Sequence, residues 1–214
     1  MNTAITELER EALYKVIYSR RDVRGQYLPE LVPDDVISRV LDAAHHAPSV
    51  GFMQPWDFIV VKDVALRQAI KEGFDLAHQE AAAMFPLDKR DTYRSFKLEG
   101  ILEAPLGICV TCDRSRSGSV VIGRTANPEM DLYSSVCAVQ NLWLAARAEN
   151  LGVGWVSIIH HDHIRNVLGI PEHIVPVAYL CMGYVSFFHE TPELQQAGWL
   201  PRLELETLVH HETW

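Results

Sequence analysis

Three arginines and one aspartate crowd together near the N-terminus, in the run Arg20, Arg21, Asp22, Val23, Arg24. Arginine suits phosphate binding, because its planar guanidinium offers paired donors to two oxygens at once. The three charges can equally be solvated groups that complement the C-terminal dipole of the helix before them. Asp22 is then either a salt-bridge partner of a neighbouring arginine or a carboxylate held beside a bound phosphate ester. The residues by themselves leave both interpretations open.

A second segment that could do chemistry is the loop PSVGFMQPW, residues 48–56, between a predicted helix and a predicted strand. Its two prolines and its glycine impose an irregular backbone. Ser49, Met53 and Gln54 on this loop could present hydrogen-bonding groups and a soft apolar surface to a heterocycle.

Two further groups carry weaker signals. His45 and His46 are interpreted as ordinary helix-end residues, since no acidic or cysteine ligand stands nearby at metal-binding spacing. Arg114, Arg116 and Arg124 lie in a polar loop, where solubility is a simpler explanation than a second anion site.

The elements that must position these groups centre on residues 130–159, where a long apolar helix over 130–148 precedes a strand over 153–159. Apolar side chains surround the helix axis, so this helix is expected to be buried on all sides, and a second subunit is one way to cover it. Its length is about 30 Å, and its polar residues favour a soluble helix over a membrane span. Gly152 is expected to end the helix in the left-handed conformation. Gly152 and Gly154 together would let a planar group approach the backbone closely.

The remaining pattern predicts a single domain, residues 1–214, that mixes helices and short strands. Helices are expected near residues 8–20, 33–46 and 162–169, the last capped by Asp162, and strands near 58–61, 106–113 and 176–185. Residues 64–104 are helical, charged and interrupted near Pro86, which suggests a mobile lid. Residues 186–214 are expected to form an arm that pairs with a sheet edge, in this subunit or in another.

Composition excludes several classes of protein. Hydrophobic residues make up 48% of the 214 residues, which suits a globular domain, and the net charge of −9 argues against nucleic acid or an anionic membrane as the main partner. The N-terminal segment lacks the continuous apolar core of a signal peptide, so a cytoplasmic protein is expected. The four cysteines, at positions 109, 112, 137 and 181, are expected to be buried reduced thiols, not metal ligands or disulfides.

Five motifs occur in order along nearly the whole chain: RRDVR, APSVGFMQPW, CVTCDR, GRTANPEMDLYSSVCAVQNLWLAARAE and GVGWVS. Together they resemble the nitroreductase-like flavoprotein superfamily, and within it the 5,6-dimethylbenzimidazole synthases. Phe52 stands where ordinary nitroreductases usually have asparagine, and it cannot make the same polar contact with the flavin. This departure favours the synthase branch, as does the aspartate of RRDVR, which is the catalytic residue in that branch.

The resemblance implies an α+β fold with a central, mostly antiparallel sheet flanked by helices, in an intertwined homodimer whose C-terminal arms exchange. Two FMN sites would lie at the subunit interface. Arg20, Arg21 and Arg24 would hold the FMN phosphate, with Arg202 as a weaker candidate. The isoalloxazine ring would be lined by Ser49, Gly51, Met53, Gln54, Pro105 and Leu106, and the backbone around Gly154 and Ser157 would face its N5 side.

The resemblance also implies that reduced FMN is a substrate, which O2 converts to 5,6-dimethylbenzimidazole, the lower ligand of vitamin B12, and D-erythrose 4-phosphate. No metal is implied, and a separate NAD(P)H flavin reductase would supply the reduced FMN. Asp22 would act as a base near the ribityl C1′, kept ionised by the adjacent arginines, and Ser157 would hydrogen-bond near the flavin N5. Two rival functions stay open: an NAD(P)H-dependent nitro- or quinone reductase of the same fold, and a non-catalytic flavin-binding protein in which Asp22 is merely a salt-bridge partner.

Overall fold

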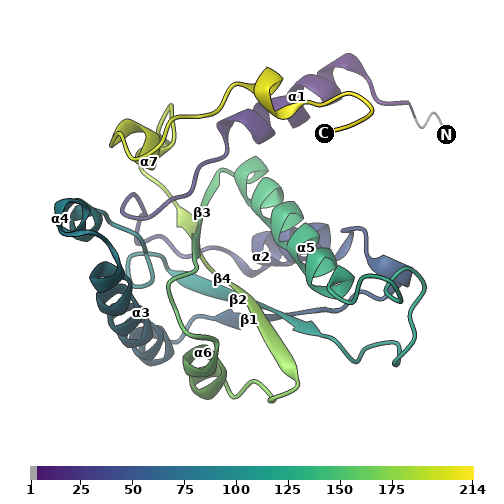
Figure 1. The fold of residues 1–214 in the computed structure, drawn as a ribbon, viewed down its shortest axis with the longest axis horizontal. Helices are drawn as coiled ribbons and strands as arrows, with labels where there is room; N and C mark the ends of the chain where they lie inside the picture. The colour runs from purple at the N-terminus through teal and green to yellow at the C-terminus, as the bar shows by residue number, and fades with distance from the viewer. Residues whose placement is uncertain (1–3) are drawn as a thin grey trace.

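The structure, a computed structural model, describes residues 4–214 and is built on one antiparallel sheet (Figure 1). Four strands lie in the order β1-β2-β4-β3, and every neighbouring pair is antiparallel. Their bounds are β1 Trp56–Val61, β2 Leu106–Asp113, β3 Leu151–Val156 and β4 Ile174–Tyr184. The strands and the α+β class expected from the sequence are confirmed.

Helices cover both faces of this sheet. The helices are α1 Glu7–Ser19, α2 Asp34–His45, α3 Val64–Met84, α4 Leu87–Ser95, α5 Met130–Ala148, α6 His161–Leu168 and α7 Glu193–Gln196, with 3-10 turns η1 Val50–Phe52 and η2 Leu205–Leu208. Alternate residues of β2 point to opposite faces, so Ile108 joins the core beneath α2 and α5, whereas Cys109 joins the core beneath α3 and α6. The sheet is therefore buried on both sides, and chemistry is confined to its edges and ends.

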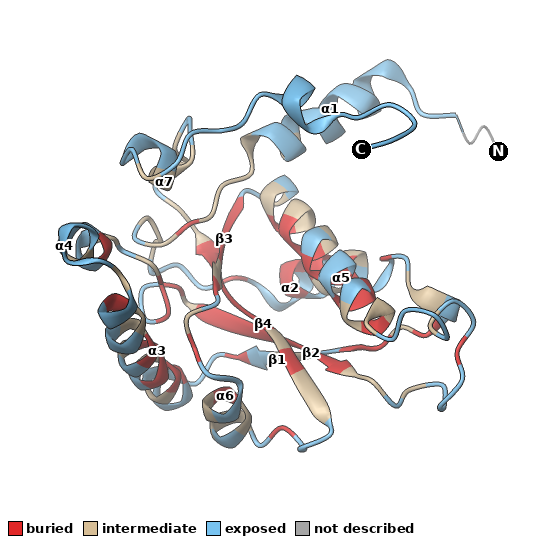
Figure 2. Cartoon of the chain, in the orientation of Figure 1, coloured by how far each residue is buried: buried red, intermediate tan, exposed pale blue. Residues whose placement is uncertain are grey.

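Helix α1 and the C-terminal segment 186–214 stand outside this body. Neither contains a buried residue, and apolar side chains such as Leu8, Leu13 and Leu205 are more than half exposed. Figure 2 shows both as pale blue ribbons on one side of the red core. A large apolar surface that the single chain leaves open is typical of a protein interface.

Helix α5 differs from the prediction of burial on all sides. Its buried residues, which include Ala138, Val139 and Leu142, face the sheet and α2, whereas Tyr133, Val136 and Cys137 on the other side are exposed. The prediction that every cysteine is buried is likewise wrong at Cys137. The apolar pattern of α5 therefore reflects two surfaces of the helix, only one of which the single chain covers.

Two predicted helix ends are also wrong. Asn150, at φ +60°, supplies the left-handed residue after α5, and Gly152 lies inside β3. Helix α6 begins after His160 as its N-cap, so Asp162 lies in its first turn and does not cap it, whereas Gly169 closes it as expected. None of the helices within residues 4–214 is both long and apolar enough to cross a bilayer.

Candidate functional site

Asp22 lies against the free edge of β3. The backbone amide of Val23 donates to the carbonyl of Val153 at 3.0 Å, so the chain adds a short parallel bridge to the strand. The carboxylate of Asp22 then accepts from the backbone amide of Trp155 at 3.0 Å and from Nη2 of Arg24 at 2.7 Å. Both carboxylate oxygens are thereby held in one orientation beside the arginine loop.

The glycines of β3 explain why this close approach is possible. A Cβ atom added to Gly154 would lie 2.1 Å from the carbonyl oxygen of Val23, and one added to Gly152 would clash with side chains of Val23 and Val185. The space beside these two glycines is occupied by Val23 and Val185 of the same chain, and not by a planar group as expected from the sequence. Tyr27 completes the arrangement, because its hydroxyl donates to the carbonyls of Val23 at 3.2 Å and Cys181 at 2.9 Å.

The electrostatics of Asp22 are set mainly by burial. Burial raises the pKa of its carboxyl above the ordinary value, while the charge of Arg24 and the hydrogen bond from Trp155 lower this pKa and offset part of the rise. Arg24 thus favours the ionised form, as expected, but burial has the larger effect on the pKa. A raised pKa brings a carboxyl closer to the neutral range, which suits a group that accepts and returns a proton.

The clustered arginines have different partners. The guanidinium of Arg20 lies 4.8 Å from the ring centre of Trp143. The pKa of Arg20 is lowered, mainly by burial, and the positive charge of Arg202 on the arm also lowers it. Arg21 donates to the carbonyls of Tyr18 and Arg20 at 2.8 and 2.7 Å and to that of Glu190, which ties the loop to the arm.

Positive charge in this cluster exceeds what nearby carboxylates neutralise. Arg24 pairs with Asp22 and, at 3.9 Å, with Glu193, but within residues 4–214 Arg20, Arg21 and Arg202 form no salt bridge. The Nε atom of Arg21 is also buried without a hydrogen-bond partner in that part of the chain. These donors fit the phosphate of FMN, since a dianionic group would satisfy the unpaired guanidiniums.

Ser157 follows β3 directly. It is exposed and lies one residue past the end of β3, two residues beyond Trp155. It also lines a small cavity of about 150 Å³ together with His161 and Tyr179. The structure therefore places Ser157 on the same strand edge as Asp22 and Gly154.

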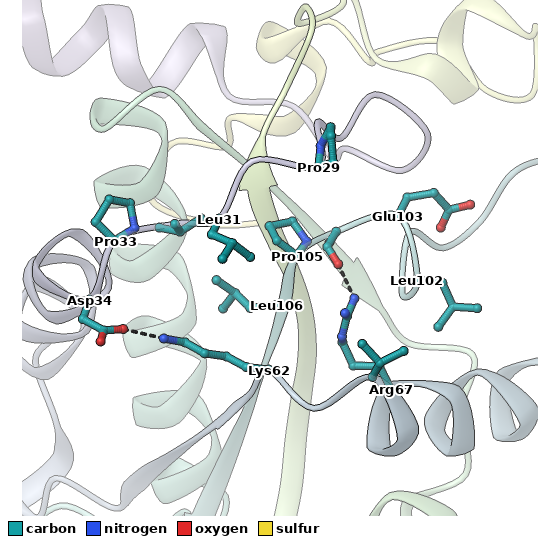
Figure 3. Close-up of a pocket in the computed structure, with 13 residues that line it drawn as sticks. Pro29, Leu31, Pro33, Asp34, Lys62, Arg67, Leu102, Glu103, Pro105 and Leu106 are labelled. Atoms are coloured by element: carbon teal, nitrogen blue, oxygen red, sulfur yellow. Dashed lines mark hydrogen bonds and ion pairs between the residues drawn. The ribbon is translucent and has the colours of Figure 1, made fainter.

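Pro105 and Leu106 line a different, larger cavity of about 740 Å³ (Figure 3). In it Lys62 pairs with Asp34, and Arg67 donates to the carbonyl of Ala104. Leu106 is only 2% exposed, and its register partner Met182 in turn faces Val153, so two strand spacings, about 10 Å, separate it from the Asp22 edge. In the single chain Leu106 is therefore not brought to Asp22, whereas the Pro105 ring packs on Gly183, which pairs with Gly152 of β3.

The loop with Ser49, Gly51, Met53 and Gln54 lies elsewhere again. The amide of Val50 donates to Oγ of Ser134 in the first turns of α5 at 3.0 Å, and Ser49 Oγ accepts from the amide of Gln54 at 3.0 Å. Gly51 has φ +54°, and a Cβ there would lie 2.6 Å from Val121, so glycine is required.

Side-chain exposure differs sharply within this loop. Met53 is only 2% exposed and lies 3.8 Å from Nη1 of Arg124, whereas Phe52 is 83% exposed at φ +55°. The left-handed backbone of Phe52 is sterically unfavourable, and its exposed ring is unfavourable in water. Both features point to a surface that a partner covers.

Ion pairs pin the arginines of residues 114–124. Arg114 and Arg124 both pair with buried Asp131, at 3.2 and 3.1 Å, and Arg116 binds Asp57 through two hydrogen bonds. They fix the loop that supports Gly51, a role that neither solubility nor an anion site describes.

The two groups of site residues contact opposite ends and sides of α5. The 49–54 loop contacts Ser134, whereas the arginine loop receives a hydrogen bond from Nε1 of Trp143 to the carbonyl of Arg21 at 3.3 Å. Trp143 lies nine positions after Ser134, which corresponds to about two and a half turns and about 14 Å, so these side chains project from opposite sides of the helix. In Figure 1 the two loops lie at the two ends of α5. One chain therefore keeps these two groups of candidate residues apart.

Several residues at the site escape prediction from sequence. Trp155 contributes only a backbone amide, while Tyr27, Trp143 and Glu193 contribute side chains. Their partners are up to 167 positions away in the chain, and no local pattern signals such pairs. Across the described part of the chain, no group of three histidine, cysteine or acidic residues is arranged to hold a metal ion.

Relatives and solved structures agree with this architecture. The model of the nitroreductase family matches residues 17–184. A 5,6-dimethylbenzimidazole synthase of Rhodospirillum rubrum is 40% identical over 193 residues, which cover 90% of this chain and 91% of the relative, and one of Rhodobacter capsulatus is 36% identical over 94% and 96%.

Two solved structures share the fold. Oxidised iodotyrosine deiodinase bound to FMN and 3-iodo-L-tyrosine superposes with a TM-score of 0.76 at 21% identity, covering 94% of this chain and 100% of the other. A BluB-like flavoprotein from Clostridium difficile 630 gives 0.72 at 22% identity, covering 94% and 99%. The chain therefore belongs to the nitroreductase family, a family of oxidoreductases, with 5,6-dimethylbenzimidazole synthases among its relatives.

Proposed function

We propose that this enzyme is a 5,6-dimethylbenzimidazole synthase, which uses O2 to fragment reduced FMN into 5,6-dimethylbenzimidazole and D-erythrose 4-phosphate. The observation that carries the proposal is the setting of Asp22: a carboxylate of raised pKa, held by Trp155 and Arg24 beside two arginines, Arg20 and Arg21, that form no salt bridge among residues 4–214. The synthases of Rhodospirillum rubrum and Rhodobacter capsulatus that align with most of the chain support it.

FMN fits the site by charge. Its phosphate would be held by Arg20 and Arg24, with Arg21 and Arg202 adding positive charge, and its sugar chain would then extend toward Asp22. Reduced FMN would itself supply the electrons that activate O2, so the protein need only orient it, exclude water and move protons.

Asp22 would supply the base. Breaking the ribityl C1′–C2′ bond requires removal of a proton near C1′ or from the 2′-hydroxyl, and a positioned carboxylate typically accelerates such a step by about 10²–10⁴. The bond from the Trp155 amide keeps one oxygen oriented while the proton moves. Ser157, one residue past the end of the same strand, would hydrogen-bond near the flavin N5.

A homodimer would complete the site. The loop with Ser49, Gly51, Met53 and Gln54 cannot reach the Asp22 edge of its own chain, but the same loop of a second copy could cover a flavin bound there. The exposed face of α5, the exposed α1 and the arm 186–214 together offer the surface for such a dimer, with exchange of the arm residues beyond Trp199. Pro105 and Leu106 would line the flavin only if the site extends across the sheet edge.

Packing limits the range of residues within 64–104 that could move as a lid. Helix α3 buries Ile70, Phe74 and Ala77 in the core, whereas Tyr93 is the buried residue of α4. We therefore assign the mobile segment to residues 85–97. A separate NAD(P)H flavin reductase would supply reduced FMN.

The test is aerobic incubation of the purified protein with chemically reduced FMN, with products resolved by chromatography and mass spectrometry. A benzimidazole peak is expected, and it should be lost in Asp22→Asn. Quantitative return of intact oxidised FMN would reject the proposal. It would favour the NAD(P)H nitroreductase activity suggested by the name of a putative enzyme of Archaeoglobus fulgidus, which is 30% identical over 180 residues.

A further inference from the structure

Trp199 joins the C-terminal arm to the helix α4. Its ring meets Phe85 at 5.7 Å and Phe96 at 5.4 Å between ring centres, both in edge-to-face geometry. Phe85 and Phe96 flank α4 at its two ends, and Nζ of Lys89 within α4 lies 6.0 Å from the Trp199 ring. A single indole thus touches the start, the middle and the end of this segment.

The backbone places Trp199 without help from α4. Gly198, at φ +71°, follows the C-cap residue of α7. Its amide donates to the carbonyl of Gln195 at 3.0 Å, and the amide of Trp199 donates to the carbonyl of Leu194 at 2.9 Å. These two bonds form a Schellman motif, which turns the chain sharply after the helix. Trp199 is therefore a fixed point to which α4 can attach.

On its other side α4 is attached to the core through stacked rings. Phe85 stacks on Tyr93 at 4.5 Å, Tyr93 on His78 at 4.9 Å, and His78 on buried Phe74 at 5.3 Å. The Tyr93 hydroxyl and Nε2 of His78 are buried without a hydrogen-bond partner among residues 4–214, so ring contacts are what hold this ladder. Without Trp199 the last ring of this stack, Phe85, would face solvent.

The same arm contacts the loop of Asp22. Glu193 in α7 accepts from Nε2 of Gln26 at 2.9 Å and lies 3.9 Å from Arg24, the arginine that binds Asp22. A cavity of about 360 Å³ lies between the arm, Arg24 and the end of α4, where Phe96 and Lys97 form its wall. The contact between Trp199 and Phe96 therefore joins two walls of a cavity that adjoins the proposed base.

We infer that Trp199 is a positioning residue, which holds α4 against the arm and so keeps the Phe96 wall of the cavity beside Arg24 in place. The structural part of the inference concerns α4 alone. The consequence of this contact for chemistry rests on the proposed function: a cavity wall fixed in place would help to retain the sugar phosphate and to exclude water beside Asp22.

The experiment compares wild type with Trp199→Ala, Trp199→Phe and, as a control on the same arm, Trp214→Ala, whose side chain is fully exposed. Amide hydrogen exchange is measured over residues 87–97, with α5 as internal reference. Loss of two aromatic contacts should speed exchange over 87–97 about 5- to 100-fold in Trp199→Ala, with much of the protection restored in Trp199→Phe. Phe96→Leu, which removes the other side of the contact, should reproduce the effect if Trp199→Ala folds poorly.

A second measurement addresses chemistry. In Trp199→Ala the share of reduced FMN returned as intact FMN should rise several-fold, and in Trp199→Phe it should rise less. Unchanged exchange in both Trp199→Ala and Phe96→Leu would overturn the assignment, and so would faster exchange with an unchanged product ratio. Exchange reports on α4 even if wild type makes no benzimidazole, so failure of the proposed function would be recognised separately.

Discussion

The backbone amide of Trp155 donates a 3.0 Å hydrogen bond to Oδ1 of Asp22, and this bond joins residues 133 positions apart. It uses a main-chain donor on a sheet edge, so it orients the carboxylate without placing a second charge there. Because Arg24 holds the other oxygen, the carboxylate of Asp22 cannot rotate without losing both bonds.

Replacing Asp22 by Asn should abolish benzimidazole formation while FMN still binds. The amide oxygen can still accept from Trp155, but the side chain can no longer take a proton, so the rate should fall about 10²–10⁴-fold. Product chromatography and FMN titration check this pair of outcomes. Normal turnover would remove Asp22 from the mechanism.

The same variant should be more stable than wild type at neutral pH. A carboxyl whose pKa is raised by folding contributes stability that is fully present below its unfolded pKa of about 3.9 and is lost as the pH rises through the folded pKa. Asp22→Asn removes this loss, so its melting temperature should exceed that of wild type at pH 7 and match it near pH 3. Asp91→Asn, at a side chain that is 96% exposed, should show no such gain. A lower melting temperature for Asp22→Asn at pH 7 would show that Arg24 outweighs burial.

Arg24→Ala should weaken binding of FMN more than that of riboflavin. A charged hydrogen bond contributes about 1.5–3 kcal/mol, or about 10- to 150-fold in Kd, and riboflavin lacks the phosphate that would receive it. Arg39→Ala, whose exposed side chain pairs with Asp35 and Glu149 away from both loops, is the matched control. Equal losses for the two flavins would contradict a phosphate site at Arg24.

Ser157→Ala should slow benzimidazole formation about 2- to 12-fold, the range expected for one neutral hydrogen bond, or divert reduced FMN to intact FMN. Ser38→Ala on the exposed face of α2 serves as control, since its hydroxyl bonds only within its helix. An unchanged rate and product ratio would leave Ser157 without a role.

Mixing two inactive variants tests the division of the site between chains. If a loop of one subunit covers the Asp22 edge of the other, hybrids of Asp22→Asn and Gly51→Val contain one intact site, and random mixing should restore about one quarter of wild-type activity. Gly51→Val is chosen because it would collide with Val121 and Ile122 and so disable only its own loop. No recovery in confirmed hybrids would mean that both groups of candidate residues serve the same chain.

Local periodicity was enough to predict much of the fold. Helix α2 begins after Pro33, β2 follows Pro105 as a continuous apolar run, and the arginine cluster directly follows α1, all as expected. Such features depend on residues a few positions apart, whose conformational preferences act within one helix turn or one strand.

Tertiary packing decided the rest. Gly152 and Gly154 are required by Val23, a residue about 130 positions earlier, and the pKa of Asp22 depends on burial that no neighbour in sequence produces. Apolar side chains occur on both the exposed and the buried side of α5, so only the packed chain distinguishes the two sides. The sequence by itself determined which elements form and which residues carry charge. Which of those residues meet was determined only in three dimensions, because contacts between distant segments depend on how the helices pack on the sheet.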